Sequence, residues 1–92
     1  MNIENLLAAL EQQYEEALEE LVSLAEVDKD DFTMVNIHHG EYLHQAYGAL
    51  KLCQSYLCKA GHTNLAELVK KEWTEKWCDK FWAILDKYRP TV

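Results

Sequence analysis

Apolar residues near the N-terminus recur at intervals that alternate between four and three. This spacing lines side chains up along one side of an α-helix, and it is the spacing of a heptad repeat. The residues are Ile3, Leu7, Leu10, Tyr14, Ala17, Leu21 and Leu24. The pattern predicts a helix over residues 3–25, and that helix needs other helices to cover its apolar side.

The same rhythm predicts a second helix over residues 33–60, against which the other two are expected to fold. Its apolar side would carry Phe32, Asn36, His39, Leu43, Ala46, Leu50, Cys53 and Leu57. A polar residue on such a side commonly fixes helix register or oligomeric state, which is the expectation for Asn36 and His39. A cap from Asp30, Asp31 or Thr33 suits its start. Gly40 is a possible break within it.

A third helix is predicted over residues 64–89, between the stop signals Gly61 and Pro90. Thr63 or Asn64 is expected to cap its start. Its apolar side carries Leu65, Val69, Trp73, Trp77, Phe81, Ile84 and Tyr88. Pairs of opposite charge four residues apart, Glu67–Lys71 and Glu72–Lys76, would support it.

These three helices predict an all-α fold, an up-down-up three-helix bundle in one domain over residues 1–92. Broad apolar sides in so short a chain favour self-association, so a homo-oligomer is expected. No stretch approaches the roughly 20 apolar residues of a membrane span, and no basic segment precedes a hydrophobic block as in a secretory signal. Three cysteines without close pairing, Cys53, Cys58 and Cys78, are expected as reduced, buried thiols. The expected location is the cytoplasm of a bacterium or of a cell that hosts a phage.

The charge is distributed unevenly along the chain. Residues 1–31 hold ten acids and one base, a formal charge of −9, whereas the remainder holds six acids and eight bases, +2, which gives the net −7. Arg89 is the one arginine. Because direct binding to nucleic acid needs a basic surface, the composition argues against it. The composition is compatible with an acidic surface that imitates nucleic acid or docks on a basic protein.

Most of the acids of the first predicted helix lie opposite its apolar side. One interpretation is a solvated surface that lysines of the third helix, Lys70, Lys71, Lys76 and Lys80, partly neutralise. The other is a docking surface for a basic protein partner, with Trp82 as a second exposed anchor. The candidate partner-binding residues are Glu11, Glu15, Glu16, Glu19, Glu20 and Trp82.

A carboxylate and a histidine, Glu41 and His44, stand three residues apart, a spacing found in di-iron sites of helical bundles. Together with His38 and His39 they form a candidate ligand or metal site. The neighbouring histidines point about 100° apart on a helix, which opposes a shared ion. No cofactor is therefore predicted. The connector at Asp28 lacks the glycine and glutamate of a calcium loop.

No nucleophile motif and no glycine-rich phosphate loop occur in the chain, so it is not expected to be an enzyme. The stretch Leu43-His44-Gln45-Ala46-Tyr47-Gly48-Ala49-Leu50 resembles part of the second helix of phage anti-CBASS cyclic-nucleotide sponges. The resemblance implies an oligomer that sequesters a signalling nucleotide between protomers. This chain lacks a Tyr-Arg motif near its N-terminus and adds a third helix, so the resemblance assigns no ligand-binding residue.

These observations favour a small acidic, non-enzymatic binding or inhibitor protein that docks on another macromolecule. A basic protein that handles nucleic acid is the partner expected from the charge. A phage counter-defence protein, of an anti-CRISPR-like or nucleic-acid-mimicking kind, would fit it. The alternatives are an oligomeric cyclic-nucleotide sponge and a carboxylate–histidine metal-binding protein.

Overall fold

The computed structural model describes residues 2–90, and over that range the chain is helical without any strand. Helix α1 spans Ile3–Val27, α2 spans Phe32–Lys59, α3 spans Thr63–Glu72 and α4 spans Cys78–Tyr88. A π-helical turn, Trp73–Trp77, joins α3 to α4, so these segments form one bent helix. The all-α prediction is confirmed, and the helix ends lie within two residues of those expected.

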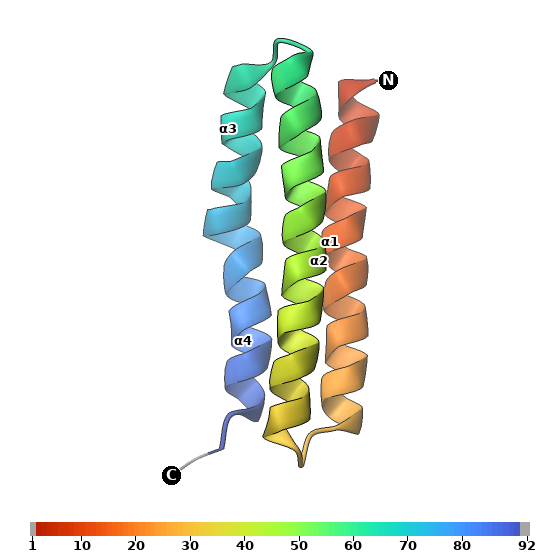
Figure 1. Cartoon of the computed structure of the whole chain (residues 1–92), viewed down its shortest axis with the longest axis vertical. Helices are drawn as coiled ribbons and strands as arrows, with labels where there is room; N and C mark the ends of the chain where they lie inside the picture. Colours follow the sequence, from red (N-terminus) through yellow and green to blue (C-terminus); the bar gives the residue numbers. More distant parts are fainter. Residues whose placement is uncertain (1, 91–92) are drawn as a thin grey trace.

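Helix α2 lies between α1 and the α3–α4 pair, and it packs against both (Figure 1). The start of α1 and the end of α4 lie at opposite ends of an elongated molecule of 49 × 21 × 15 Å. The central place expected for the second helix is therefore confirmed. Over residues 2–90, no helix combines the length and apolarity that crossing a lipid bilayer requires.

Side chains cap the first two helices at their starts. The Asn2 side-chain oxygen accepts a hydrogen bond from the Glu4 amide at 2.7 Å, and the Asp31 carboxylate accepts one from the Met34 amide at 3.3 Å. Helix α3 starts after His62 without a side-chain cap, so the caps expected from Thr63 or Asn64 were wrong. Helix α2 runs through Gly40 without a break.

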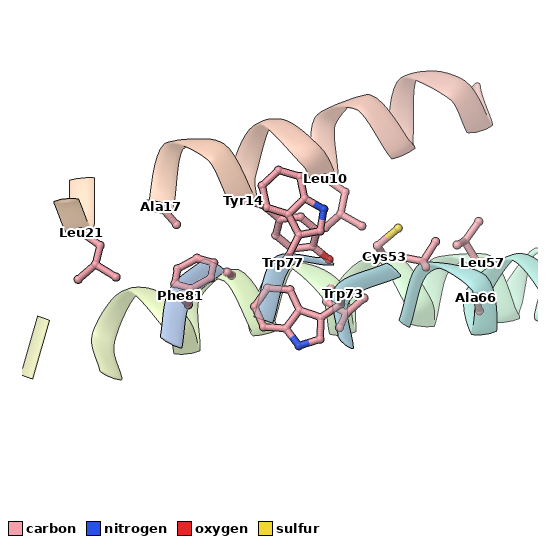
Figure 2. Close-up of a cluster of buried hydrophobic side chains, with 13 residues drawn as sticks. Leu10, Tyr14, Ala17, Leu21, Cys53, Leu57, Ala66, Trp73, Trp77 and Phe81 are labelled. Atoms are coloured by element: carbon pink, nitrogen blue, oxygen red, sulfur yellow. The ribbon is translucent and has the colours of Figure 1, made fainter. Parts of the chain in front are cut away.

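The core lies between all three helices. Phe81, Leu21, Leu50, Leu57 and Val35 are its largest fully buried side chains. Figure 2 shows its aromatic centre, where Tyr14 of α1 lies beside two tryptophans of the third helix. The ring centroids of Tyr14 lie 5.1 Å from those of Trp73 and 5.0 Å from those of Trp77. These tilted pairs stabilise the core beyond simple area burial.

The buried sides differ in detail from the predicted ones. In α2, Val35 is fully buried and Asn36 is exposed, which corrects the prediction of Asn36 on the apolar side. Val35 stands four residues before His39, so its side chain points about 40° away from that of His39 around the helix axis. Asn36 stands three residues before His39 and points about 60° away on the other side. Val35 is thus closer to the side that His39 faces.

The π-helical turn compensates for the four-residue spacing of apolar residues in the third helix. Val69, Trp73, Trp77, Phe81 and Leu85 are buried and stand four residues apart. Phe81 follows Val69 by twelve positions, so in an unbroken α-helix their side chains would point about 120° apart around the helix axis. A π turn takes up one extra residue, which reduces that separation to about 20°. The turn therefore keeps all five residues on the core side.

Candidate interaction surfaces

The acidic side of α1 is exposed along the helix. Its five candidate residues, Glu11, Glu15, Glu16, Glu19 and Glu20, all face solvent. The Gln12 side-chain nitrogen donates a hydrogen bond to the Glu16 carboxylate at 3.0 Å. The surface thus presents carboxylates to the surroundings, in the position where the sequence placed them.

In the part of the chain that the structure describes, these carboxylates form no ion pair. Within residues 2–90, the ion pairs closer than 4 Å are Glu26–Lys29, Asp28–His38 and Asp86–Arg89. The third-helix lysines expected to neutralise α1 therefore form no ion pair with it. Instead, the ammonium groups of Lys76 and Lys80 lie 5.1 and 4.5 Å from the centre of a Trp77 ring. Among the described residues, the expected pairs Glu67–Lys71 and Glu72–Lys76 form no ion pair closer than 4 Å either.

One polar contact joins the acidic helix to α4. The Tyr88 hydroxyl donates to the Glu26 carboxylate at 2.7 Å. That bond lowers the pKa of Glu26, with help from Lys29, and raises the pKa of Tyr88. The contact fixes the C-terminal end of α1 against the end of α4.

Trp82 belongs to α4 and not to the acidic side of α1. Its side chain is 45% exposed, and its ring packs on His39 of α2 with 4.6 Å between the ring centroids. The structure therefore divides the predicted partner-binding residues between two surfaces, one on α1 and one where α2 meets α4. Trp82 keeps enough exposed area to contact a partner.

The candidate metal residues do not converge. The His38 Nε2 atom lies 2.7 Å from an Asp28 carboxylate oxygen, whereas His39 is 2% exposed and points into the protein. Glu41 and His44 are exposed. Over residues 2–90, no group of three or more histidine, cysteine or acidic side chains could hold a metal ion. Burial lowers the pKa of His39, and the Phe81 backbone and Asp86 only partly oppose this effect.

An uncharged groove runs along the seam of α1 and α2. Its volume is about 340 Å³, and Leu52 on its edge is 76% exposed. Its lining consists of Leu6, Ala9, Leu10, Gln13, Ala49, Leu52, Cys53 and Tyr56. Burial raises the pKa of the Cys53 thiol, which makes it a poor nucleophile. Cys58 is exposed and Cys78 is partly buried, so the prediction of buried cysteines was wrong for these two.

A second cleft opens between the first half of α1 and α3. Its volume is about 300 Å³, and its lining consists of Leu7, Ala8, Leu10, Glu11, Tyr14, Leu65, Leu68, Val69 and Glu72. Sequence reasoning missed this cleft and treated Tyr14 as a packing residue alone. The sequence signal for this cleft was the phenol of Tyr14 among the aliphatic residues on the apolar side of the first helix, and it was not used.

Two polar atoms in the aromatic centre have no hydrogen-bond partner within the described chain. They are the Tyr14 hydroxyl and the indole nitrogen of Trp77. Burial raises the pKa of Tyr14 most strongly, and Cys53, Glu72 and Glu11 raise it further. The phenol therefore keeps its proton at physiological pH.

Comparison with known proteins finds no match: no family model, no curated protein and no solved structure is significantly similar to this chain. The acidic side of α1, Trp82 and the clefts therefore provide the evidence for function.

Proposed function

We propose that this chain is a non-enzymatic binding protein that docks the acidic side of α1 on a basic protein. The observation that supports this most directly is the set of five exposed α1 carboxylates without an ion pair in the described chain. Carboxylates left unpaired in the free protein can pair with lysines or arginines of a partner. Complementary charge also speeds association and selects the partner.

The partner class follows from the same charge. A surface that binds nucleic acid is basic because it neutralises phosphates, so a row of carboxylates can occupy it. An inhibitor of such a protein, for example a phage counter-defence protein in a bacterial cytoplasm, fits this proposal. Neither direct nucleic-acid binding nor membrane association forms part of it. No cofactor does either.

The test compares two variants with the same change in net charge. Replacing Glu15, Glu16, Glu19 and Glu20 by glutamine should abolish binding to the partner recovered with the wild-type chain. The control replaces four exposed acids elsewhere: Glu41, Glu67, Glu75 and Asp79 by their amides. Calorimetric titration measures affinity and circular dichroism measures helicity. Equal losses in both variants would contradict a specific α1 surface.

We further propose that the chain forms an up-down-up bundle with heptad-patterned sides, and that a second copy covers the α1–α2 groove. The groove carries no charge in a chain of net charge −7. Leu52 protrudes beside Ala9 and Ala49, whose small side chains leave room for a leucine from another copy. In a two-fold dimer, Leu52 of each copy would pack beside Ala9 and Ala49 of the other copy.

The cyclic-nucleotide sponge is the less favoured alternative. Within the stretch that resembles those proteins, Ala46 and Leu50 are buried in the core. The adjoining groove is lined by Gly40, Leu43, His44, Tyr47, Trp73 and Cys78. It has no lysine or arginine to pair with a phosphate, so the observed surfaces favour the protein-docking proposal.

A further inference from the structure

The cleft between α1 and α3 has the size of a small ligand site. Its volume of about 300 Å³ stands at the low end of the range for such sites. Leu7 and Leu10 contribute apolar walls from α1, and Leu65 and Val69 contribute them from α3. Leu68 on its edge is 57% exposed and adds apolar surface that a bound ligand would cover.

The charged residues that line this cleft are both acidic. Glu11 comes from α1 and Glu72 from α3, so the two carboxylates approach the cleft from different helices. Both are exposed, and within residues 2–90 neither belongs to an ion pair. No lysine, arginine or histidine lines the cleft. Its polar character is therefore that of a receptor for a cation.

The Tyr14 phenol adds a third polar group. Tyr14 lines the cleft and is 2% exposed, and its hydroxyl has no partner in the described chain. A buried hydroxyl without a hydrogen bond destabilises a protein, so a group that binds beside it is favoured. Glu11 and Glu72 line the same cleft as Tyr14, so the three residues share one region.

We propose that the cleft binds a small organic ammonium ion whose apolar chain lies between the leucines of α1 and α3. The ammonium group would lie between Glu11 and Glu72, and the apolar chain would cover the exposed leucine at the edge. Carboxylic acids would be repelled by the two carboxylates, and a neutral molecule would desolvate them without compensation. This site shares Glu11 with the docking surface on α1, but it also needs Glu72 of α3 and takes a small ligand, so its test is separate from the docking test.

The test titrates the full chain with n-hexylamine at neutral pH, where the amine carries its proton. Binding is followed by tryptophan fluorescence, since Trp73 and Trp77 both contact Tyr14. Hydrogen bonds to charged groups predict that 1-hexanol binds about tenfold more weakly than n-hexylamine. Hexanoate should show no saturable binding.

Two charge-matched double variants locate the site. Glu11→Gln with Glu72→Gln should weaken n-hexylamine binding to the level of 1-hexanol. Glu15→Gln with Glu75→Gln removes the same charge outside the cleft and should leave the affinity unchanged. All four residues are exposed, so thermal melting should confirm that both variants fold.

A third variant, Ala8→Phe, places a ring in the cleft and should abolish binding of the amine. Three results would overturn the proposal: no saturable amine binding, 1-hexanol binding as tight as the amine, or equal weakening in both double variants. The last result would show adsorption to a generally acidic surface. None of these results depends on whether α1 docks on a protein partner.

Discussion

Tyr14 combines two roles that conflict energetically. Its ring joins the helices through contacts with Trp73 and Trp77, which stabilises the fold. Its hydroxyl is buried without a hydrogen-bond partner in the described chain, which destabilises the fold. A phenylalanine would keep the first effect and remove the second. The packing of the core therefore requires the ring of Tyr14 but not its hydroxyl.

Replacing Tyr14 by phenylalanine should raise the free energy of unfolding by about 1 kcal/mol, because an unsatisfied buried hydroxyl is removed. Urea denaturation measures the change. The matched control is Tyr88→Phe, which deletes the hydroxyl that donates to Glu26 at 2.7 Å. That variant should lose about 0.5–1 kcal/mol instead. A loss of stability in Tyr14→Phe would show that this hydroxyl is satisfied in solution.

At the scale of single elements, α2 contains two glycines that its packing does not require. A methyl group added at Gly40 or Gly48 would meet no other atom within 4 Å. Glycine inside a helix costs about 1 kcal/mol relative to alanine. Gly61 differs, because its φ of +84° lies in the left-handed region that ends α2.

Gly40→Ala and Gly48→Ala should therefore each raise the free energy of unfolding by about 0.5–1 kcal/mol. Gly61→Ala should lower it by about 1 kcal/mol, because alanine is strained at a positive φ. Thermal and urea unfolding of the three variants measure these effects. A stabilised Gly61→Ala, or a destabilised Gly40→Ala, would contradict the helix geometry described above.

The third helix shows how an element can combine regular spacing with irregular geometry. Four successive steps of four residues, from Val69 to Leu85, exceed the 3.6 residues of one α-helical turn. The turn at Trp73–Trp77 absorbs the excess and bends the helix. The four-residue spacing was visible in the sequence. Whether the apolar side would drift around a regular α-helix or be kept in line by a π turn depended on the partner helices.

At the scale of the whole molecule, the apolar groove of α1 and α2 predicts a dimer. The wild-type chain should sediment as a dimer at micromolar concentration, because burial of the groove and of Leu52 favours association. Leu52→Glu should make it a monomer, since a charge would be buried in an apolar interface. Analytical ultracentrifugation measures both.

The control for this prediction is Ile37→Glu. Ile37 is 54% exposed on the same helix but does not line the groove, so the variant should remain a dimer. A wild-type chain that stays monomeric at all concentrations would refute the dimer. Dissociation by Ile37→Glu as complete as by Leu52→Glu would place the interface elsewhere.

The sequence by itself determined the helices and the side on which the acids of α1 lie. Both depend on neighbours three and four residues away, and a helix presents those neighbours in a known geometry. The same local rule put His38 and His39 in different directions, and the structure shows them diverging.

Only the tertiary structure decided which borderline residues are buried, such as Val35 in place of Asn36. It also decided that, within residues 2–90, the third-helix lysines form no ion pair with the α1 carboxylates and that Glu11 and Glu72 line one cleft. The physical reason is that these features depend on the distance and rotation between helices. Side chains far apart in the chain set that distance and rotation by packing together, and periodicity within one helix carries no information about them.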